Sequence, residues 1–150
     1  MTAPANVWEL ELEPIADGVK GARLLERPSG TRLVGAVWEL EPGAESGPYH
    51  LHHATEEFLL VLDGAPTLRS PDGERDLSRG EVVHFPIGAT GAHQVLNRSA
   101  APVRYLMVAA HSGIDAIEYV DDRQVVVYST SPSLLQEEGL YLSHELPPEG

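Results

Sequence analysis

Turn-forming residues recur about every eight to twelve positions between residues 28 and 101, and this spacing limits what the chain can fold into. Each turn combines Gly, Pro, Asp or Ser in a way that interrupts regular structure. Glycine (14 residues) and proline (12 residues) make up about a sixth of the 150 residues, which is high for a helical protein. Short strands joined by turns at this spacing are typical of an antiparallel sandwich or a small barrel.

Strands are predicted for most of the chain between these turns. They cover residues 7–12 (an edge strand), 22–26, 31–40, 66–69, 74–77, 81–85, 92–97, 102–110, 114–119 and 124–128, together with the apolar run that ends at Asp63. A single helical turn is predicted at 133–138 and a loose tail from Leu146 onward. Without a repeat or a linker, residues 1–150 are expected to form one domain.

The stretch from Gly43 to Gly64 carries the first chemical signal. His50 and His52 are two positions apart, so in a strand their side chains point to the same face. A carboxylate follows shortly after them, at Glu56 or Glu57. Two imidazoles and a carboxylate that converge on one point are a plausible half of a metal site.

The stretch from Gly80 to Asn97 supplies a third histidine. A strand starts at Gly80, Pro86 and Gly88 turn it, and His93 begins the returning strand. A histidine at that position can face the first two across a barrel.

At this point the chain resembles the cupin superfamily. The first cupin motif is a Gly-led turn, His-x-His, three or four residues, Glu, six residues and Gly. Here His50-x-His52 is followed by four residues, Glu57, six residues and Gly64. Six residues rather than five separate Gly43 from His50, which is one departure from the motif.

The second cupin motif is Gly, five residues, Pro-x-Gly, a gap, His, three residues and Asn. This chain has the matching residues in that order: Gly80, Pro86, Gly88, His93 and Asn97. Four residues rather than two lie between Gly88 and His93, a second departure that can shift His93 slightly and change the shape of the pocket. The resemblance covers roughly residues 40–110.

The resemblance implies an all-β fold: a cupin double-stranded β-helix, which is a jelly-roll-like barrel of two antiparallel sheets, with short N- and C-terminal additions. It also implies a divalent transition metal (Fe, Mn, Ni, Zn, Co or Cu) bound by His50, His52, Glu57 and His93. Glu56 competes with Glu57, because a spacing of three residues also occurs in the family. A bend or bulge at residues 53–55 must re-aim the chain between His52 and Glu57.

Other polar residues have weaker claims to the site. His84 and Tyr49 are the candidate catalytic residues, although His84 also suits a structural role and Tyr49 a place in the core. His111 and His144 are expected at the surface. If Glu57 faces inward, Phe58, Leu60 and Leu62 face outward and need a cover, which favours a homodimer.

Charge and composition restrict the partners. The formal net charge of −13 disfavours binding to nucleic acid and to anionic membranes. The chain has no cysteine, so disulfides and thiolate zinc sites are excluded. No apolar run approaches the roughly 20 residues of a membrane span, and no signal peptide is recognisable at the N-terminus, so a cytoplasmic protein is expected.

Function follows only by analogy with the family. We expect a small metal-dependent enzyme of the oxygenase or isomerase type that acts on a small, anionic molecule. The alternative is a non-catalytic cupin that binds or senses a small molecule in the same pocket.

Overall fold

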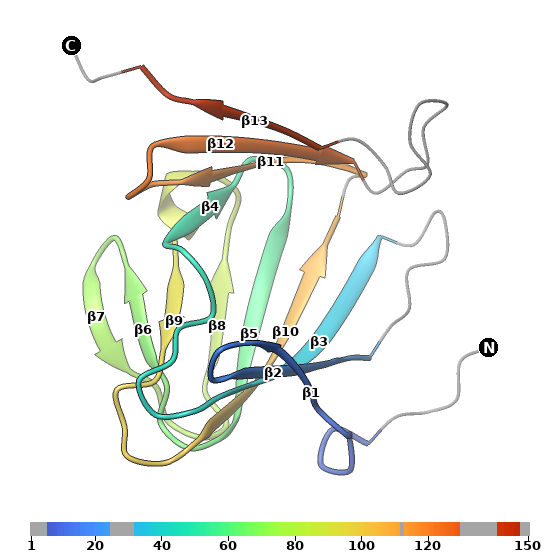
Figure 1. Ribbon diagram of the computed structural model, residues 1–150, viewed down its shortest axis with the longest axis vertical. Coiled ribbons are helices and arrows are strands. Elements are labelled where there is room, and N and C mark those ends of the chain that lie inside the picture. The colour runs from blue at the N-terminus through green and yellow to red at the C-terminus, as the bar shows by residue number, and fades with distance from the viewer. Residues whose placement is uncertain (1–5, 25–31, 112, 130–140, 148–150) are drawn as a thin grey trace.

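The computed structural model describes residues 6–24, 32–111, 113–129 and 141–147. These residues form strands that pair only in antiparallel fashion, in three sheets. The all-β barrel expected from the turn spacing is therefore confirmed (Figure 1).

The largest sheet has six strands in the order β1-β2-β3-β10-β5-β8. Their bounds are β1 (Glu13–Ala16), β2 (Val19–Arg23), β3 (Leu33–Leu40), β10 (Val103–Ala110), β5 (Glu56–Asp63) and β8 (Val82–Phe85). Strand β10 lies at its centre and pairs with β3 on one side and β5 on the other.

Two smaller sheets complete the barrel. One has the order β13-β12-β11-β4, with β13 (Tyr141–Glu145), β12 (Gln124–Ser129), β11 (Ile114–Tyr119) and β4 (His50–His52). The other has the order β7-β6-β9, with β7 (Gly73–Asp76), β6 (Thr67–Ser70) and β9 (Gln94–Leu96). Figure 1 shows β11, β12 and β13 lying across one end of the barrel, next to β4.

The core follows from the period of two in the strands. On β5, Leu59 and Val61 point into the barrel and are almost fully buried, whereas Phe58 between β8 and β10 points outward and is 39% exposed. Tyr105 of β10 and Leu40 of β3 join the same buried cluster. The inner row of β5 continues at its start with Glu57, so the apolar core ends where the polar site begins.

The N-terminal segment differs from the sequence-based expectation. Residues 7–12 form no strand, because Asn6 starts a turn instead. The side-chain oxygen of Asn6 accepts the N–H of Trp8 at 3.0 Å, and its carbonyl accepts the N–H of Glu9 at 3.0 Å. An Asn side chain that bonds to nearby backbone offers the chain this alternative to a sheet.

The C-terminal segment adds a strand that the sequence pattern did not predict. Strand β13 pairs with β12 along its whole length, from Tyr128↔Tyr141 to Gln124↔Glu145. The helical turn predicted at 133–138 lies outside the described residues. No helix in the described part of the chain has the length and hydropathy that a membrane span requires.

Candidate metal centre

Strand β4 places two histidines on one face. His50 and His52 flank the buried Leu51, which points the other way. The strand is held on one side by β11, where Ile117 lies opposite His52 and Tyr119 lies opposite His50. The alternation predicted from the sequence therefore brings both imidazoles to the same side of a fixed strand.

Glu57 enters the site after a bend. The chain bends at His53 and Ala54, and β5 then begins, so that Glu57 faces into the barrel beside Leu59. Glu56 points the other way, and one of its carboxylate oxygens lies 3.5 Å from Nε2 of His84 on the outer face. The structure thus places Glu57, and not Glu56, beside the histidines.

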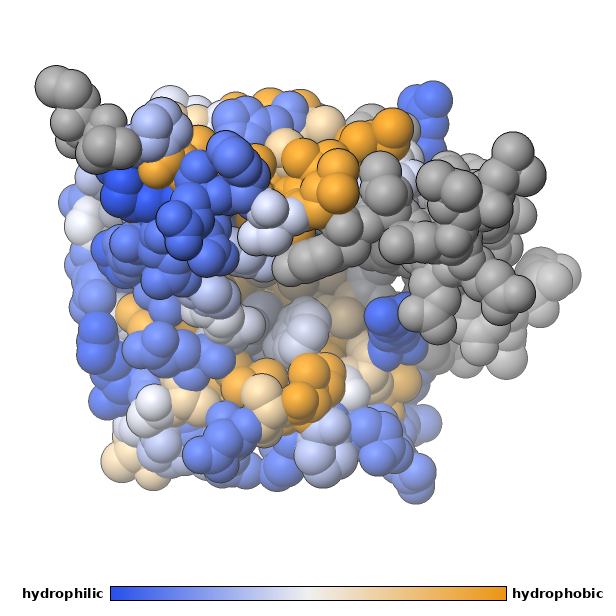
Figure 2. Space-filling model, turned by 45° about the horizontal axis from the view of Figure 1, so that its top comes forward, coloured by the Kyte–Doolittle hydropathy of each residue, from blue (hydrophilic) through white to orange (hydrophobic). Residues whose placement is uncertain are grey.

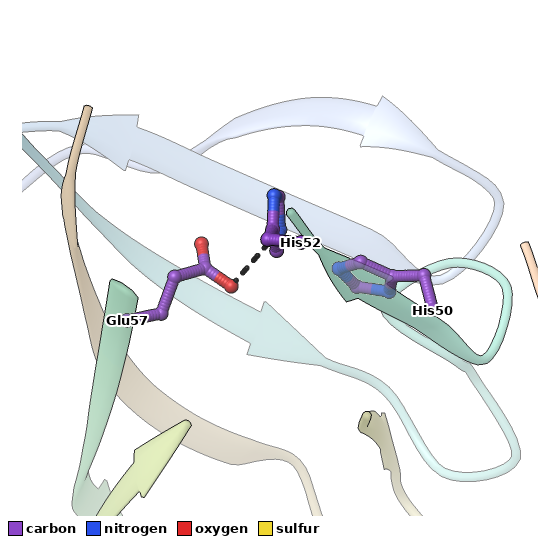
Figure 3. Close-up of side chains that lie close together, drawn as sticks. All are labelled: His50, His52 and Glu57. Atoms are coloured by element: carbon purple, nitrogen blue, oxygen red, sulfur yellow. Dashed lines mark ion pairs between the residues drawn. The ribbon is translucent and has the colours of Figure 1, made fainter. Parts of the chain in front are cut away.

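The three residues form a compact cluster (Figure 3). One ligand atom from each of His50, His52 and Glu57 lies within 4.8 Å of the others, which makes the group a possible metal site. The Oε2 atom of Glu57 lies 3.2 Å from Nε2 of His52. The same oxygen lies 3.4 Å from Nε2 of His93, so the third predicted histidine also borders the cluster.

His93 reaches this position through the turn after Gly88. The two extra residues in this gap belong to a short 3₁₀ turn, η1 (Ala89–Gly91), and His93 still pairs directly with His50. The backbone N–H groups of His93 and His50 donate to each other's carbonyl oxygens at 2.8 and 3.1 Å. The ring of Phe85 stacks on the imidazole of His93 at 3.8 Å between centroids, which fixes its plane.

All three histidines have Nδ1 held by an oxygen. The Nδ1–H of His50 donates to the carbonyl of Pro48 at 2.9 Å, and the Nδ1–H of His93 donates to the carbonyl of Gly91 at 2.9 Å. The Nδ1–H of His52 donates to a carboxylate. Because the hydrogen sits on Nδ1 in each case, Nε2 carries the lone pair of the neutral ring and is the atom available to a metal.

Asp115 is the carboxylate that holds His52, and sequence reasoning missed it. Its Oδ2 atom accepts Nδ1–H of His52 at 2.6 Å, and its Oδ1 atom accepts the N–H of Ala54 at 2.8 Å. One buried side chain therefore orients the imidazole of His52 and holds the bend before Glu57. Asp115 lies on β11, beyond both motifs, so the only signal was a polar residue in a predicted strand.

Burial and charge act differently on the ionisable groups. Burial lowers the pKa of His93 to about 4 and also lowers the pKa of His50. Burial disfavours the charged form of His52 as well, but its contacts with Asp115 and Glu57 outweigh this and raise its pKa to about 9. Burial would raise the pKa values of the two carboxyl groups, but the partners of each outweigh it: the pKa of Glu57 is lowered and that of Asp115 falls to about 2.

The donor set fits a divalent transition metal. Once a metal displaces the second proton of His52, three imidazole Nε2 atoms and one ionised carboxylate are ligands that suit Fe, Mn, Co, Ni, Cu and Zn. Second partners on Nδ1, as found for all three histidines, are the usual companions of metal-bound imidazoles.

The two predicted catalytic candidates do not join the cluster. His84 lies opposite Phe58 on the outer face of the barrel, and its side chain is 62% exposed. Tyr49 carries the guanidinium of Arg69 over its ring at 4.1 Å and does not line the cavity that reaches the site.

His111 is buried, contrary to the expectation of a surface position. Its Nδ1 lies 3.2 Å from the hydroxyl of Thr55 and 3.2 Å from that of Tyr128. His111 and Tyr128 line the cavity of about 600 Å³ that leads to His52 and Glu57. His144, in contrast, is exposed as expected.

Comparisons with known proteins agree with this arrangement. The family model described as the cupin domain matches residues 36–109. A sugar phosphate isomerase of the cupin superfamily from Silicibacter pomeroyi is 28% identical, with a TM-score of 0.74 over 86% of this chain and 77% of that chain. The polyketide cyclase RemF from Streptomyces resistomycificus is 26% identical, with a TM-score of 0.60 over 73% of this chain and 80% of that chain.

A third likeness concerns the fold alone. The cupin domain of an XRE family transcriptional regulator from Enterobacter cloacae is 22% identical, with a TM-score of 0.52 over 63% of this chain and 97% of that chain. No curated protein matches the chain. The match over residues 36–109, the antiparallel barrel and the likeness to solved cupin structures together show that the protein belongs to the cupin family.

Proposed function

We propose that this protein is a metal-dependent enzyme that acts on a small molecule, with His50, His52, Glu57 and His93 as the metal ligands. One observation carries the proposal: three histidines that donate Nδ1–H elsewhere border one ionised carboxylate. Burying these polar side chains together costs free energy, and a bound cation would offset this cost by coordinating all four of them.

The charge of the ligand set indicates what would bind there. Three neutral imidazoles and one carboxylate leave a divalent ion with a local charge of about +1. A bound metal would supply Lewis-acid chemistry or activation of oxygen, and Fe, Mn, Ni, Co, Cu and Zn all suit these ligands. An anionic oxygen of the substrate is attracted to this end of the cavity despite the acidic exterior of the protein.

We propose that the reaction is of the oxygenase or isomerase type. Isomerisation needs a group that moves a proton. His111 and Tyr128 line the cavity and are the proposed general acid or base. The likeness to a sugar phosphate isomerase and to a polyketide cyclase supports an enzyme over a purely structural protein.

Reconstitution tests the proposal. Untagged protein is stripped with a chelator, loaded with one metal at a time, and offered a panel of small keto, hydroxy and aromatic acids and sugar phosphates. Oxygen consumption indicates an oxygenase, and conversion without oxygen consumption indicates an isomerase. Tight ligand binding without turnover for any metal identifies a binding or sensing module and contradicts the enzyme proposal.

A homodimer is the second part of the proposal. The outer face of β5, β8 and β10 carries Phe58, Leu60, Val82, Leu106 and Val108, of which Val82 is 61% exposed. A second copy that packs on this face would remove these side chains from water. Light scattering at micromolar concentration tests it: twice the chain mass supports the dimer, and the monomer mass contradicts it.

A further inference from the structure

The cavity that leads to the candidate metal centre is larger than a two-carbon acid needs. Its volume of about 600 Å³ falls within the range of roughly 300–1,000 Å³ that is typical of pockets for drug-sized ligands. Strands β1, β2, β3 and β10 form most of its wall, and His52 and Glu57 lie at one end. Figure 2 shows a hollow in the surface, with hydrophobic atoms beside it.

The wall of this cavity is mainly carbon. Its apolar side chains are Ile15, Ala22, Val34, Ala36, Trp38, Met107 and Ala109. Small residues help to flatten it: a Cβ on Gly21 would meet Cδ1 of Ile15 at 2.7 Å and Cε3 of Trp38 at 3.3 Å, so Gly21 lets these two side chains close over the strand. The polar lining residues are Glu13, Arg23, His52, Glu57, His111 and Tyr128. Hydroxyl groups of a ligand that lie against the apolar part of the wall would lose hydrogen bonds to water there.

Arg23 is the basic residue in the wall. It lies on β2 opposite Ala36 of β3, on the same inward-facing row as Gly21. Five other basic side chains form ion pairs with carboxylates: Lys20, Arg69, Arg75, Arg98 and Arg104. Among the described residues, no carboxylate forms an ion pair with Arg23. Glu13 lies diagonal to Arg23 across β1 and β2, and it does not form an ion pair with Arg23 either.

Within the described ranges no carboxylate pairs with the Arg23 guanidinium, on a chain with a formal net charge of −13. Arg23 is an exposed residue that lines the cavity, and arginine binds carboxylate and phosphate groups through two parallel hydrogen bonds. The cavity therefore has a cationic group in its wall in addition to the proposed metal at its end.

The sheet register gives the separation of these two groups. Arg23 lies opposite Ala36, Ala36 opposite Met107, and Met107 opposite Leu59, which is two residues from Glu57. Three strand spacings of about 4.8 Å put β2 roughly 14 Å from β5, measured along the curved sheet. An anionic group on Arg23 and an oxygen beside Glu57 would thus belong to opposite ends of an extended ligand.

We propose that the cavity binds an organic acid with an apolar, ring-sized body, whose anionic group pairs with Arg23 and whose second oxygen function reaches the His52–Glu57 end. The second contact rests on the proposed metal function, and the first does not. Sugar phosphates satisfy the charge of Arg23 but not the carbon wall.

Calorimetry with matched ligands tests this proposal. The first probe is 6-hydroxy-2-naphthoate, which has an acid at one end and a hydroxyl at the other. Its neutral amide removes the charge, 2-naphthoate removes the hydroxyl, and fructose 6-phosphate replaces the apolar body. Binding is measured with wild-type protein, Arg23→Gln and the control Arg32→Gln, whose arginine does not line the cavity.

The expected result is that the acid binds to wild type and to Arg32→Gln about tenfold or more tightly than the amide does. Arg23→Gln removes this preference and leaves the affinity for the amide unchanged. Equal affinities for acid and amide, no effect of Arg23→Gln, or tighter binding of fructose 6-phosphate would overturn the proposal.

Repeating the measurement on chelator-treated protein separates the two proposals. The dependence on Arg23 persists without metal if the proposal is right. The advantage of 6-hydroxy-2-naphthoate over 2-naphthoate is expected only in metal-loaded protein. If no metal binds under any condition, the metal proposal fails, and the comparison of acid with amide still tests the role of Arg23.

Discussion

Asp115 holds Nδ1 of His52 at 2.6 Å across 63 residues of sequence, and its second oxygen holds the backbone of Ala54. The family match ends at residue 109, so this carboxylate lies outside the region that defines the family. The sheet that lies across the end of the barrel therefore orients His52, a proposed metal ligand that the first motif supplies.

Replacement of Asp115 by Asn tests this orientation. The amide oxygen can still accept the N–H of Ala54, but the negative charge that makes His52 a better donor is lost. The dissociation constant for the metal is expected to rise about 10–100-fold, measured by competition with a chelating dye. The exposed Asp122 serves as the control, because Asp122→Asn should change nothing. An unchanged metal affinity in Asp115→Asn would contradict the assigned role.

The protonation of His52 predicts how metal binding depends on pH. In the metal-free protein its pKa is about 9, so at pH 7 the ring carries an extra proton that a metal must displace. The pKa values of His50 and His93 are lowered, so these rings are already neutral and release nothing. Metal affinity should therefore rise with pH up to about 9, with about one proton released per ion at pH 7.

Calorimetry in buffers of different ionisation enthalpy measures that proton count. Protein dialysed at pH 5 should also retain less metal than protein dialysed at pH 7.5. A release of no proton at pH 7, or equal retention at both pH values, would show that His52 does not bind the metal through Nε2.

The turn before His93 has no room for a side chain at Gly91. A Cβ on Gly91 would overlap the carbonyl oxygen of Pro86, and the carbonyl of Gly91 is the group that holds Nδ1 of His93. Gly91→Ala should therefore destabilise the protein by about 1–3 kcal/mol and weaken metal binding. Thr90→Ala, at an exposed position in the same turn, is the control for thermal unfolding. Equal melting temperatures for the two variants would contradict this prediction.

Asn97 ends the second motif. We expect its replacement by Ala to lower the stability of the protein without directly affecting the proposed metal ligands. Its side chain is buried, donates to the carbonyls of Leu40 and Ala101 at 2.9 and 2.8 Å, and accepts from Ser99. Asn97→Ala removes these bonds and a further one that Asn97 accepts from the hydroxyl of Ser99, although that hydroxyl still donates to the carbonyl of Ala101. We expect a loss of about 2–4 kcal/mol in the free energy of unfolding, for four broken bonds. A change below 0.5 kcal/mol, which is about the scatter of surface substitutions, would refute this.

Local pattern was enough to predict the barrel, and the resemblance to the two cupin motifs supplied the four candidate ligands. The period of two placed His50 and His52 together, and turns at Gly and Pro residues placed the strands around them. Parity along β5 also explains why Glu57 faces inward while His84, opposite Phe58, faces outward. These are short-range properties that a sequence displays directly.

The remaining parts of the site depend on pairing between distant strands. Asp115 and Tyr128 reach the site only because β11 pairs with β4 and β12, and Arg23 faces the cavity only through the register of β2 with β3. Nothing in the local pattern of residues 114–128 distinguishes an inward polar side chain from a surface one. The strand predicted at residues 7–12 was wrong for a local reason. A side-chain hydrogen bond of Asn6 favours a turn over the weak alternation of apolar and polar residues.

If Glu57 completes a metal site with the three histidines, its loss removes the metal, whereas loss of the neighbouring Glu56 on the outer face does not. Untagged wild-type protein, Glu57→Gln and Glu56→Gln are each loaded with the same metal, dialysed against a weak chelator and analysed for metal by mass spectrometry. We predict about one ion per chain for wild type and for Glu56→Gln, and a much lower content for Glu57→Gln. Equal metal content in all three proteins, or a loss confined to Glu56→Gln, would show that Glu57 is not a metal ligand.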